Sequence, residues 1–154
     1  MVLGFLGVGH LASYTIEGLR HAGDRRRIVL SPRNSAVAAE LVERHGCELA
    51  EHNQAVIDSC EAVVLSVRPD SVADLLSDVQ FKSGQLVISV MAGVSLRDLQ
   101  KHSNLCDVVL VRSLPIQCAA VGVGPLPLYP GNAVAGEIGI ADNVDKLLNA
   151  TRSG

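Results

Sequence analysis

The sequence predicts an α/β fold, a doubly wound and mainly parallel β-sheet with helices on both faces. Short apolar runs alternate with amphipathic segments along the chain, and short polar turns separate them. The composition is 48% hydrophobic but only 3% aromatic, which suits Val-, Leu-, Ile- and Ala-rich strands buried on both faces. We therefore expect one domain over residues 1–154, burying roughly 70% of the surface that its unfolded chain exposes.

Residues 1–22 combine a strand, a glycine turn and a helix. An apolar run over residues 1–6 precedes the pattern G-x-G-x-x-A at Gly7, Gly9 and Ala12, and residues 13–22 keep apolar side chains at helical spacing. In such a turn the first glycine allows the tight bend, the second lets main chain approach a pyrophosphate, and the alanine lets helix and strand pack closely. The helix N-terminus favours phosphate. The pattern predicts a dinucleotide ligand, although a simple βα turn has the same glycines.

The segment after the second predicted strand, residues 28–30, indicates which dinucleotide is bound. In NAD-binding domains an acidic residue about 20 residues after the glycines holds the ribose 2′-OH. Here the segment is Ser31-Pro32-Arg33-Asn34, which contains no carboxylate. Ser31 and Asn34 can donate hydrogen bonds to a 2′-phosphate, and the charged fork of Arg33 favours NADP over NAD by roughly 10-fold to 150-fold.

The same segment has a structural interpretation. Ser-Pro-Arg-Asn is turn chemistry, and Asn34 or Ser35 would cap the helix predicted over residues 35–45 in either case. Similarly, the run Arg25-Arg26-Arg27 is either a phosphate patch or, as we expect, a solvated loop before a strand.

The alternation continues to the end of the chain. Further strands are predicted over residues 47–49, 62–67, 85–90, 107–112 and 122–130, and helices over residues 35–45 (closed by Gly46), 54–57 (capped by Asn53), 70–77 (with Pro69 in the first turn), 95–102 and 142–150. Ligands bind beyond the carboxyl ends of parallel strands, where the strand order reverses. The segments that follow strands therefore form the candidate cofactor shell, which comprises residues 7–12, 31–34, 66–69, 91–93 and 113–115.

Composition argues against several classes of function. The net charge of -3 gives no support to a nucleic-acid partner. No C-x-x-C pair occurs among Cys47, Cys60, Cys106 and Cys118, so we expect reduced thiols and no metal site. The sequence shows neither a signal peptide nor an apolar run of the ~20 residues that span a bilayer. We therefore expect a cytoplasmic protein with no membrane partner.

Four segments together resemble the N-terminal domain of pyrroline-5-carboxylate reductase and of related reductases. They are residues 4–12 (GFLGVGHLA), 65–69 (LSVRP), 87–95 (VISVMAGVS) and 111–115 (VRSLP), in the order and with the separations of that family. The resemblance covers about residues 1–130. It implies a Rossmann-type domain that binds NADPH, which passes a hydride to the carbon of a cyclic imine and gives an amino acid such as proline.

The resemblance also implies roles for individual residues. The pyrophosphate is surrounded by Gly7, Val8, Gly9, His10, Leu11 and Ala12; the 2′-phosphate is held by Ser31, Arg33 and Asn34; Asn53 lies near the adenine ribose; Val67, Arg68 and Pro69 flank the cofactor; Ala92, Gly93 and Pro115 lie near the nicotinamide. Arg68 stands where the family usually has Lys, which preserves the charge.

Two departures from the family bear on activity. After Pro115 the family usually continues Asn-Thr-Pro, but this chain reads Ile116-Gln117-Cys118, which removes a polar group from the region where substrate and nicotinamide meet. The C-terminal helical domain, which makes the family's dimer and supplies much of the substrate pocket, has no counterpart in these 154 residues. No catalytic acid can be named. A missing partner domain would leave an apolar patch near the C-terminus, which favours a homodimer.

Two alternatives to an imine reductase remain. One is a non-catalytic dinucleotide-binding module. The other is an NADP oxidoreductase that uses another hydride carrier, such as a deazaflavin.

Overall fold

The computed structural model describes residues 2–21, 23–113 and 128–130, and in these residues seven strands form a single sheet. The elements follow one another in the order β1 (Leu3–Leu6), α1 (His10–His21), β2 (Ile28–Leu30), α2 (Ser35–His45), β3 (Glu48–Leu49), α3 (Asn53–Ser59), β4 (Ala62–Leu65), η1 (Pro69–Ser71), α4 (Val72–Ser77), β5 (Leu86–Ser89), α5 (Leu96–Gln100), η2 (Ser103–Leu105), β6 (Val109–Ser113) and β7 (Leu128–Pro130).

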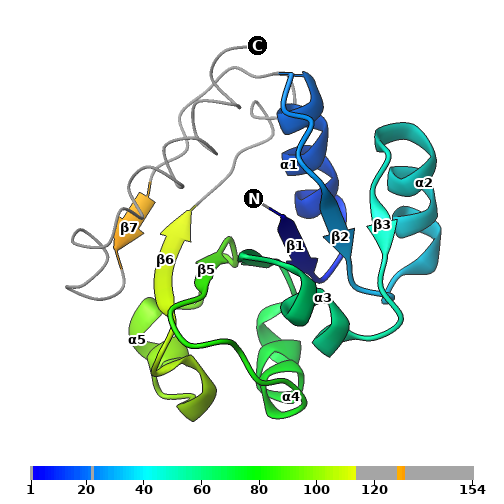
Figure 1. Ribbon diagram of the computed structural model, residues 1–154. Coiled ribbons are helices and arrows are strands. Elements are labelled where there is room, and N and C mark those ends of the chain that lie inside the picture. Colours follow the sequence, from blue (N-terminus) through cyan, green and yellow to red (C-terminus); the bar gives the residue numbers. More distant parts are fainter. Residues whose placement is uncertain (1, 22, 114–127, 131–154) are drawn as a thin grey trace.

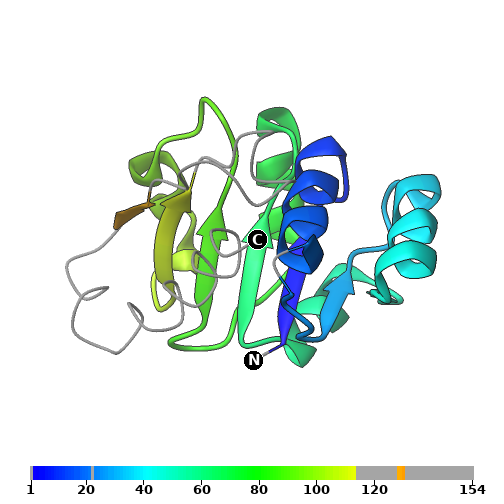
Figure 2. The same cartoon turned by 90° about the horizontal axis from the view of Figure 1, so that it is seen from above.

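The sheet has the strand order β3-β2-β1-β4-β5-β6-β7. Neighbouring strands from β3 to β6 run parallel, and β7 pairs antiparallel with β6. Figures 1 and 2 show α2 and β3 at one edge and β6 and β7 at the other. The chain runs outward from β1 to β3 and then returns to β4 on the other side of β1, so the strand order reverses between β1 and β4. Ligands of doubly wound sheets bind at this point.

Helices cover both faces of the sheet, as predicted. Side chains alternate along each strand. In β4, for example, Val64 packs in the core beneath α1 and α2, whereas Val63 and Leu65 pack in the core beneath α3, α4 and α5. Ile16 and Leu41 belong to the first core. All four residues of β4 are buried, which explains why its sequence is a continuous apolar run.

The predicted elements are largely confirmed, with shifts at their ends. The strand Ile28–Leu30 and the helix Ser35–His45 lie where the pattern placed them, and Gly46 closes that helix in the left-handed conformation with φ of 66°. Helix α1 begins at His10 rather than at residue 13, because the carbonyl of Gly9 already accepts the N–H of Ser13 at 3.0 Å. The other elements predicted between residues 1 and 113 are present too, with ends that differ from the predicted ones by a few residues.

Two predicted caps are wrong. Asn53 does not cap α3; it is the first helical residue, and Nδ1 of His52 accepts the N–H of Ala55 at 3.1 Å. Asn34 occupies the N-cap position of α2 but makes no side-chain cap bond there, and neither does Ser35, which is already helical. The helix predicted over residues 70–77 is split into the 3₁₀ turn η1, which begins at Pro69, and α4.

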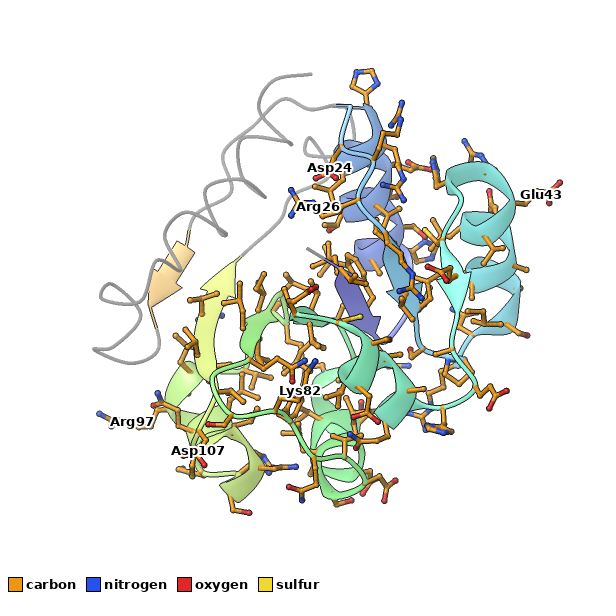
Figure 3. All side chains as sticks on the ribbon, viewed as in Figure 1. Asp24, Arg26, Glu43, Lys82, Arg97 and Asp107 are labelled. Atoms are coloured by element: carbon orange, nitrogen blue, oxygen red, sulfur yellow. The ribbon has the colours of Figure 1, made fainter. Side chains whose placement is uncertain are left out.

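The arginines at residues 25–27 lie in the loop before β2, and two of them form ion pairs. Arg26 pairs with Asp24 at 2.8 Å, side by side in Figure 3, and Arg27 pairs with Glu48 on β3. Arg25 and Arg27 are exposed. The loop enters the amino end of β2, whereas the glycine turn leaves the carboxyl end of β1, which is paired in parallel with β2. The interpretation as a structural loop therefore fits better than a cofactor-phosphate patch.

Some predictions fall outside the described residues. They include Pro115, Cys118, most of the strand predicted over residues 122–130 and the helix predicted over residues 142–150. No helix among the residues that the structure does describe is long and apolar enough to cross a bilayer.

Candidate cofactor-binding site

A hollow of about 330 Å³ lies at the carboxyl ends of β1 and β4, where the strand order reverses. Its lining comes from the glycine turn, the segment after β2 and the segment after β4: Gly7, Val8, Gly9, Arg33, Asn34, Ser66, Val67, Arg68 and Ser71. Seven of these nine residues, all except Ser66 and Ser71, were predicted from sequence as cofactor contacts. The sheet topology thus brings three of the predicted strand-end segments together.

The two glycines of the turn have different surroundings. Gly7 has φ of +91°, and a Cβ on it would lie 2.7 Å from the carbonyl carbon and oxygen of Ser66. A side chain is therefore excluded by both backbone conformation and space. A Cβ on Gly9 would meet nothing within 4 Å. The residues that the structure describes leave space at Gly9, which is where a ligand could approach the main chain.

Three side chains hold the glycine turn from neighbouring elements. Oγ of Ser31, after β2, accepts the N–H of Gly7 at 3.0 Å, and Oγ of Ser66, after β4, donates to the carbonyl of Gly7. Nδ2 of Asn34 donates to the carbonyl of Val8 at 3.0 Å. The turn is therefore fixed by polar contacts on both sides.

The N–H groups of Val8 and Gly9 are left without a partner among the hydrogen bonds of the described residues. They follow β1 directly and precede the N-terminus of α1, a helix of 12 residues with no acidic side chain in its first turn. Successive unpaired N–H groups at the positive end of a helix dipole favour an anion. The arrangement fits a phosphate or diphosphate group.

Two arginines line the same hollow. Arg33 is exposed, and the side chain of Arg68 is 87% exposed with its Nε 4.0 Å from a carboxylate oxygen of Asp70. Arg33 also lines a second hollow of about 250 Å³, which Pro32, His52, Asn53 and Leu75 help to form together with the carboxylates of Glu51, Asp74 and Asp78. Arg33 therefore stands at the junction of the two hollows, and Asn53 lies in the second one.

The other predicted contacts are distributed around these hollows. Ala12 is fully buried, as expected where helix and strand pack closely, and Leu11 packs against the same core. His10 is exposed, and its ring stacks toward Tyr14 with 6.5 Å between ring centroids. Ala92 and Gly93 form an exposed turn after β5 and line neither hollow, while Pro69 begins η1 beside Arg68.

Sequence reasoning included Ser66 in a strand-end segment without giving it a role, and it did not single out Ser71 and His52. Ser66 and Ser71 line the first hollow, and His52 lines the second. The signal for Ser66 is a polar residue at the end of the buried run of β4, at the strand-end position where ligands bind. Nothing comparable in the local pattern marks His52, because Asn is the stronger N-cap residue of the adjacent pair.

Residues 2–93 match the protein family described as NADP oxidoreductase, coenzyme F420-dependent. Among curated proteins, a pyrroline-5-carboxylate reductase from Pisum sativum is 30% identical over 139 residues, covering 88% of this chain and 50% of the relative. That from Pasteurella multocida is 33% identical over 141 residues, covering 86% and 50%. The chain spans about half the length of the curated relatives that it matches.

Solved structures show the same fold. The 1-pyrroline-5-carboxylate reductase from Streptococcus pyogenes superposes with a TM-score of 0.84 at 27% identity, over 99% of this chain and 56% of that one. The pyrroline carboxylate reductase from Plasmodium falciparum, solved with NADP bound, superposes with a TM-score of 0.82 at 19% identity, over 98% of this chain and 55% of that one. The α/β class and the doubly wound sheet predicted from sequence are confirmed.

Proposed function

Because this chain belongs to the family of NADP oxidoreductases described as coenzyme F420-dependent, we propose that it is the NADP(H)-binding domain of a reductase of the pyrroline-5-carboxylate reductase type. In this proposal residues 1–154 form one domain that binds the cofactor, and the complete enzyme reduces the C=N bond of a small cyclic imine. The two curated relatives and the Streptococcus pyogenes structure described above match over most of the chain and are pyrroline-5-carboxylate reductases, which supports this reaction.

The observation that carries the proposal is the glycine turn with its two unpartnered N–H groups. Val8 and Gly9 present main-chain donors at the start of α1, and the position of a Cβ on Gly9 is empty. A diphosphate would accept from these donors, while a side chain at Gly9 would obstruct it. The residues present therefore fit a dinucleotide.

The choice of NADP over NAD rests on Arg33. No carboxylate follows β2 before α2, so nothing there would bind a ribose 2′-OH in the manner of an NAD site or repel a 2′-phosphate. Arg33 is exposed between the two hollows, where its guanidinium could reach the phosphate of a bound adenosine. The pyrroline carboxylate reductase from Plasmodium falciparum, a structural neighbour solved with NADP bound, supports this choice.

In this function the protein binds and orients the cofactor, and NADPH supplies the hydride. The turn holds the diphosphate, Arg33 holds the 2′-phosphate, and Asn53 lies in the second hollow on the adenosine side. Val67, Arg68 and Pro69 border the cofactor after β4, and Ala92 and Gly93 lie toward the nicotinamide after β5. The remaining half of the relatives' length supplies the substrate pocket, so we expect these residues alone to bind NADPH but to reduce an imine slowly.

The proposal is tested by titrating the chain with NADPH and with NADH and following cofactor fluorescence. We expect NADPH to bind more tightly, and Arg33→Ala to lower its affinity by roughly 10-fold to 150-fold while leaving NADH affinity unchanged. Arg97→Ala is the matched control, because Arg97 is an exposed arginine on α5 (Figure 3) and lines neither hollow. Equal affinity for the two cofactors, unaffected by Arg33→Ala, would contradict the NADP assignment.

The family description also names coenzyme F420, so the alternative function is an NADP oxidoreductase that uses a deazaflavin as a second hydride carrier. Turnover assays distinguish this reaction from reduction of an imine. A longer chain that extends these residues and oxidises NADPH with a cyclic imine alone supports the proposal, whereas NADPH oxidation only with an added deazaflavin supports the alternative. Binding of NADPH with neither activity supports a non-catalytic module.

We further propose a homodimeric, cytoplasmic enzyme, which analytical ultracentrifugation and cell fractionation would check.

A further inference from the structure

We propose that Asn34 is a positioning residue for the glycine turn, orienting a main-chain donor toward the diphosphate rather than contacting the 2′-phosphate. This inference rests on the proposed function, because it concerns the same cofactor site. It assigns Asn34 and Arg33, which are neighbours in sequence, to different phosphate groups of the cofactor.

The backbone of Asn34 provides the first observation. Asn34 has φ of 58° and ψ of 64°, and it is the one non-glycine residue with positive φ in the part of the chain that the structure describes. Asn adopts this left-handed conformation more readily than most residues, but it remains an unusual one. An Asn at the start of a helix ordinarily caps that helix, and here the side chain does not. Its amide instead donates to the carbonyl of Val8, 26 residues earlier in the chain.

Planarity of the peptide bond connects that contact to the ligand. The carbonyl of Val8 and the N–H of Gly9 belong to one peptide plane and point in opposite directions. When Nδ2 of Asn34 holds the carbonyl of Val8 at 3.0 Å, it therefore also fixes the direction of the Gly9 N–H. That N–H is one of the two donors with no partner in the described hydrogen bonds, and it belongs to a residue that lines the hollow.

Ser66 acts on the preceding peptide plane in the same way. Its hydroxyl donates to the carbonyl of Gly7 and thereby fixes the direction of the Val8 N–H. Ser31 occupies the remaining donor by accepting the N–H of Gly7 at 3.0 Å. The three contacts together leave two oriented donors, those of Val8 and Gly9. Donors held in place before binding cost less ordering when the ligand arrives.

Asn34→Gly tests this role with little disturbance of the backbone, since glycine adopts positive φ without strain. We expect its affinity for NADPH and for NADH to fall by the same factor, roughly threefold to tenfold, because both carry the diphosphate. Affinity for 2′-AMP, which carries the 2′-phosphate but no diphosphate, should not change. Arg33→Ala should give the reverse pattern: the affinity for 2′-AMP and for NADPH should fall, and the affinity for NADH should not change.

Ser66→Ala is the second variant, because Ser66 follows β4 and acts through the other peptide plane. We expect Ser66→Ala also to lower the affinities for NADPH and NADH by the same factor. Thermal unfolding of each variant monitors the fold. If Asn34→Gly weakens 2′-AMP and leaves NADH unchanged, Asn34 is a 2′-phosphate ligand and the inference is wrong. If Asn34→Gly leaves all three affinities unchanged, it is also wrong.

A measurement without cofactor separates this inference from the proposed function. In ¹⁵N relaxation of the unliganded chain, we expect the Gly9 amide to become more mobile in Asn34→Gly and to keep its native order parameter in Arg33→Ala. An unaltered Gly9 amide in Asn34→Gly would overturn the positioning role even if NADPH binds. Failure of the native chain to bind either cofactor would refute the proposed function and, with it, the assignment of Asn34 to a diphosphate.

Discussion

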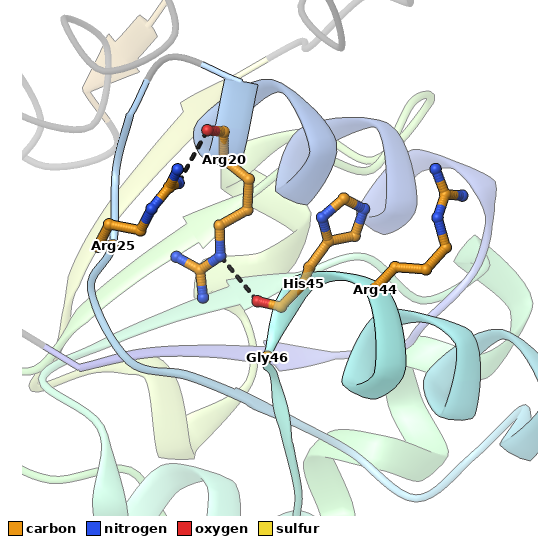
Figure 4. Close-up of a pocket in the computed structure, with 5 residues that line it drawn as sticks. All are labelled: Arg20, Arg25, Arg44, His45 and Gly46. Atoms are coloured by element: carbon orange, nitrogen blue, oxygen red, sulfur yellow. Dashed lines mark hydrogen bonds between the residues drawn. The ribbon is translucent and has the colours of Figure 1, made fainter.

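Two arginine-lined hollows lie at opposite ends of α1, and they differ in what their polar groups already contact. The hollow at the C-terminal ends of α1 and α2 is the larger, about 490 Å³, and is lined by Arg20, Arg25, Arg44, His45 and Gly46 (Figure 4). The hollow at the glycine turn is about 330 Å³. By size and charge alone, the first would be the better anion site.

The arginines of the larger hollow are occupied by the protein. Arg20 donates to the carbonyl of His45 at 2.9 Å and to those of Asp24 and Arg26 at 3.0 and 2.9 Å. Arg25 donates to the carbonyl of Arg20 at 2.9 Å, and Arg44 lies 3.0 Å from Glu40 and 3.5 Å from Glu17. The contacts of Arg20 and Arg25 satisfy carbonyls at and after helix C-termini, where cations are favoured. The hollow is therefore a structural junction.

The hollow at the glycine turn has the opposite character. The side chains of Ser31, Asn34 and Ser66 orient its main chain, and the main-chain donors of Val8 and Gly9 remain available among the described residues. Donors that the protein orients but does not use point to a ligand, whereas donors that it uses internally point to stability. Unused hydrogen-bonding capacity identifies the site better than volume or charge does.

The strongest test of this contrast is substitution of the two glycines of the turn. Gly7→Ala should lower the free energy of unfolding by about 2–5 kcal/mol, because a methyl group there meets the Ser66 backbone at 2.7 Å in a left-handed conformation. Gly9→Ala should change the free energy of unfolding by no more than about 0.5 kcal/mol, because its methyl group enters only the space of the ligand. For the same reason it should lower the affinity for NADPH about tenfold or more. Urea unfolding and fluorescence titration measure the two effects. A strongly destabilised Gly9→Ala would contradict the assignment.

A smaller loss of stability should follow from changing the structural junction. Arg20→Met keeps the apolar stem but removes the donors to three carbonyls, so we expect it to lower the free energy of unfolding by about 1–3 kcal/mol. NADPH affinity should not change. Arg44→Met is the control, since its exposed ion pairs contribute no more than about 1 kcal/mol. Loss of NADPH affinity in folded Arg20→Met would mean that the two hollows are coupled.

The smallest predicted effect is a pH dependence at the same junction. Burial, together with the nearby charge of Arg44, lowers the pKa of His45 and outweighs Glu17, whose carboxylate lies 4.0 Å from Nε2. As the pH falls, His45 is therefore protonated in the unfolded chain before it is protonated in the folded chain. Stability from neutral His45 is complete above its unfolded pKa of about 6.5 and is progressively lost as the pH falls below that value, levelling off below the folded pKa.

His45→Gln removes this titration, so urea unfolding at pH 7.5 and 5.5 should show a smaller loss of stability in the variant than in the native chain. Equal losses in the two proteins would show that His45 does not titrate differently in the folded and unfolded states. His102→Gln is a suitable comparison, because His102 lies beyond α5, away from the junction.

Local patterns predicted most of the fold and the location of the site. The apolar runs at residues 28–30 and 62–65, the helix Ser35–His45 and its terminal Gly46 follow from periodicity and capping, which act over a few residues. The pairing of the glycine turn with the ends of β2 and β4 follows from parallel topology. Two cap predictions failed: His52 caps α3 in place of the adjacent Asn53, and the side chain of Asn34 contacts Val8 instead of capping α2.

The order of apolar and polar residues was enough to specify the parallel sheet, the glycine turn at its switch point and a carboxylate-free segment after β2. The order of residues alone did not specify which polar groups remain available to a ligand. That depends on contacts of Gly7 and Val8 with Ser31, Asn34 and Ser66, which are 24, 26 and 59 residues away along the chain. Such contacts form only when parallel pairing aligns the ends of β1, β2 and β4, because hydrogen bonds depend on distance in space and not on separation in sequence.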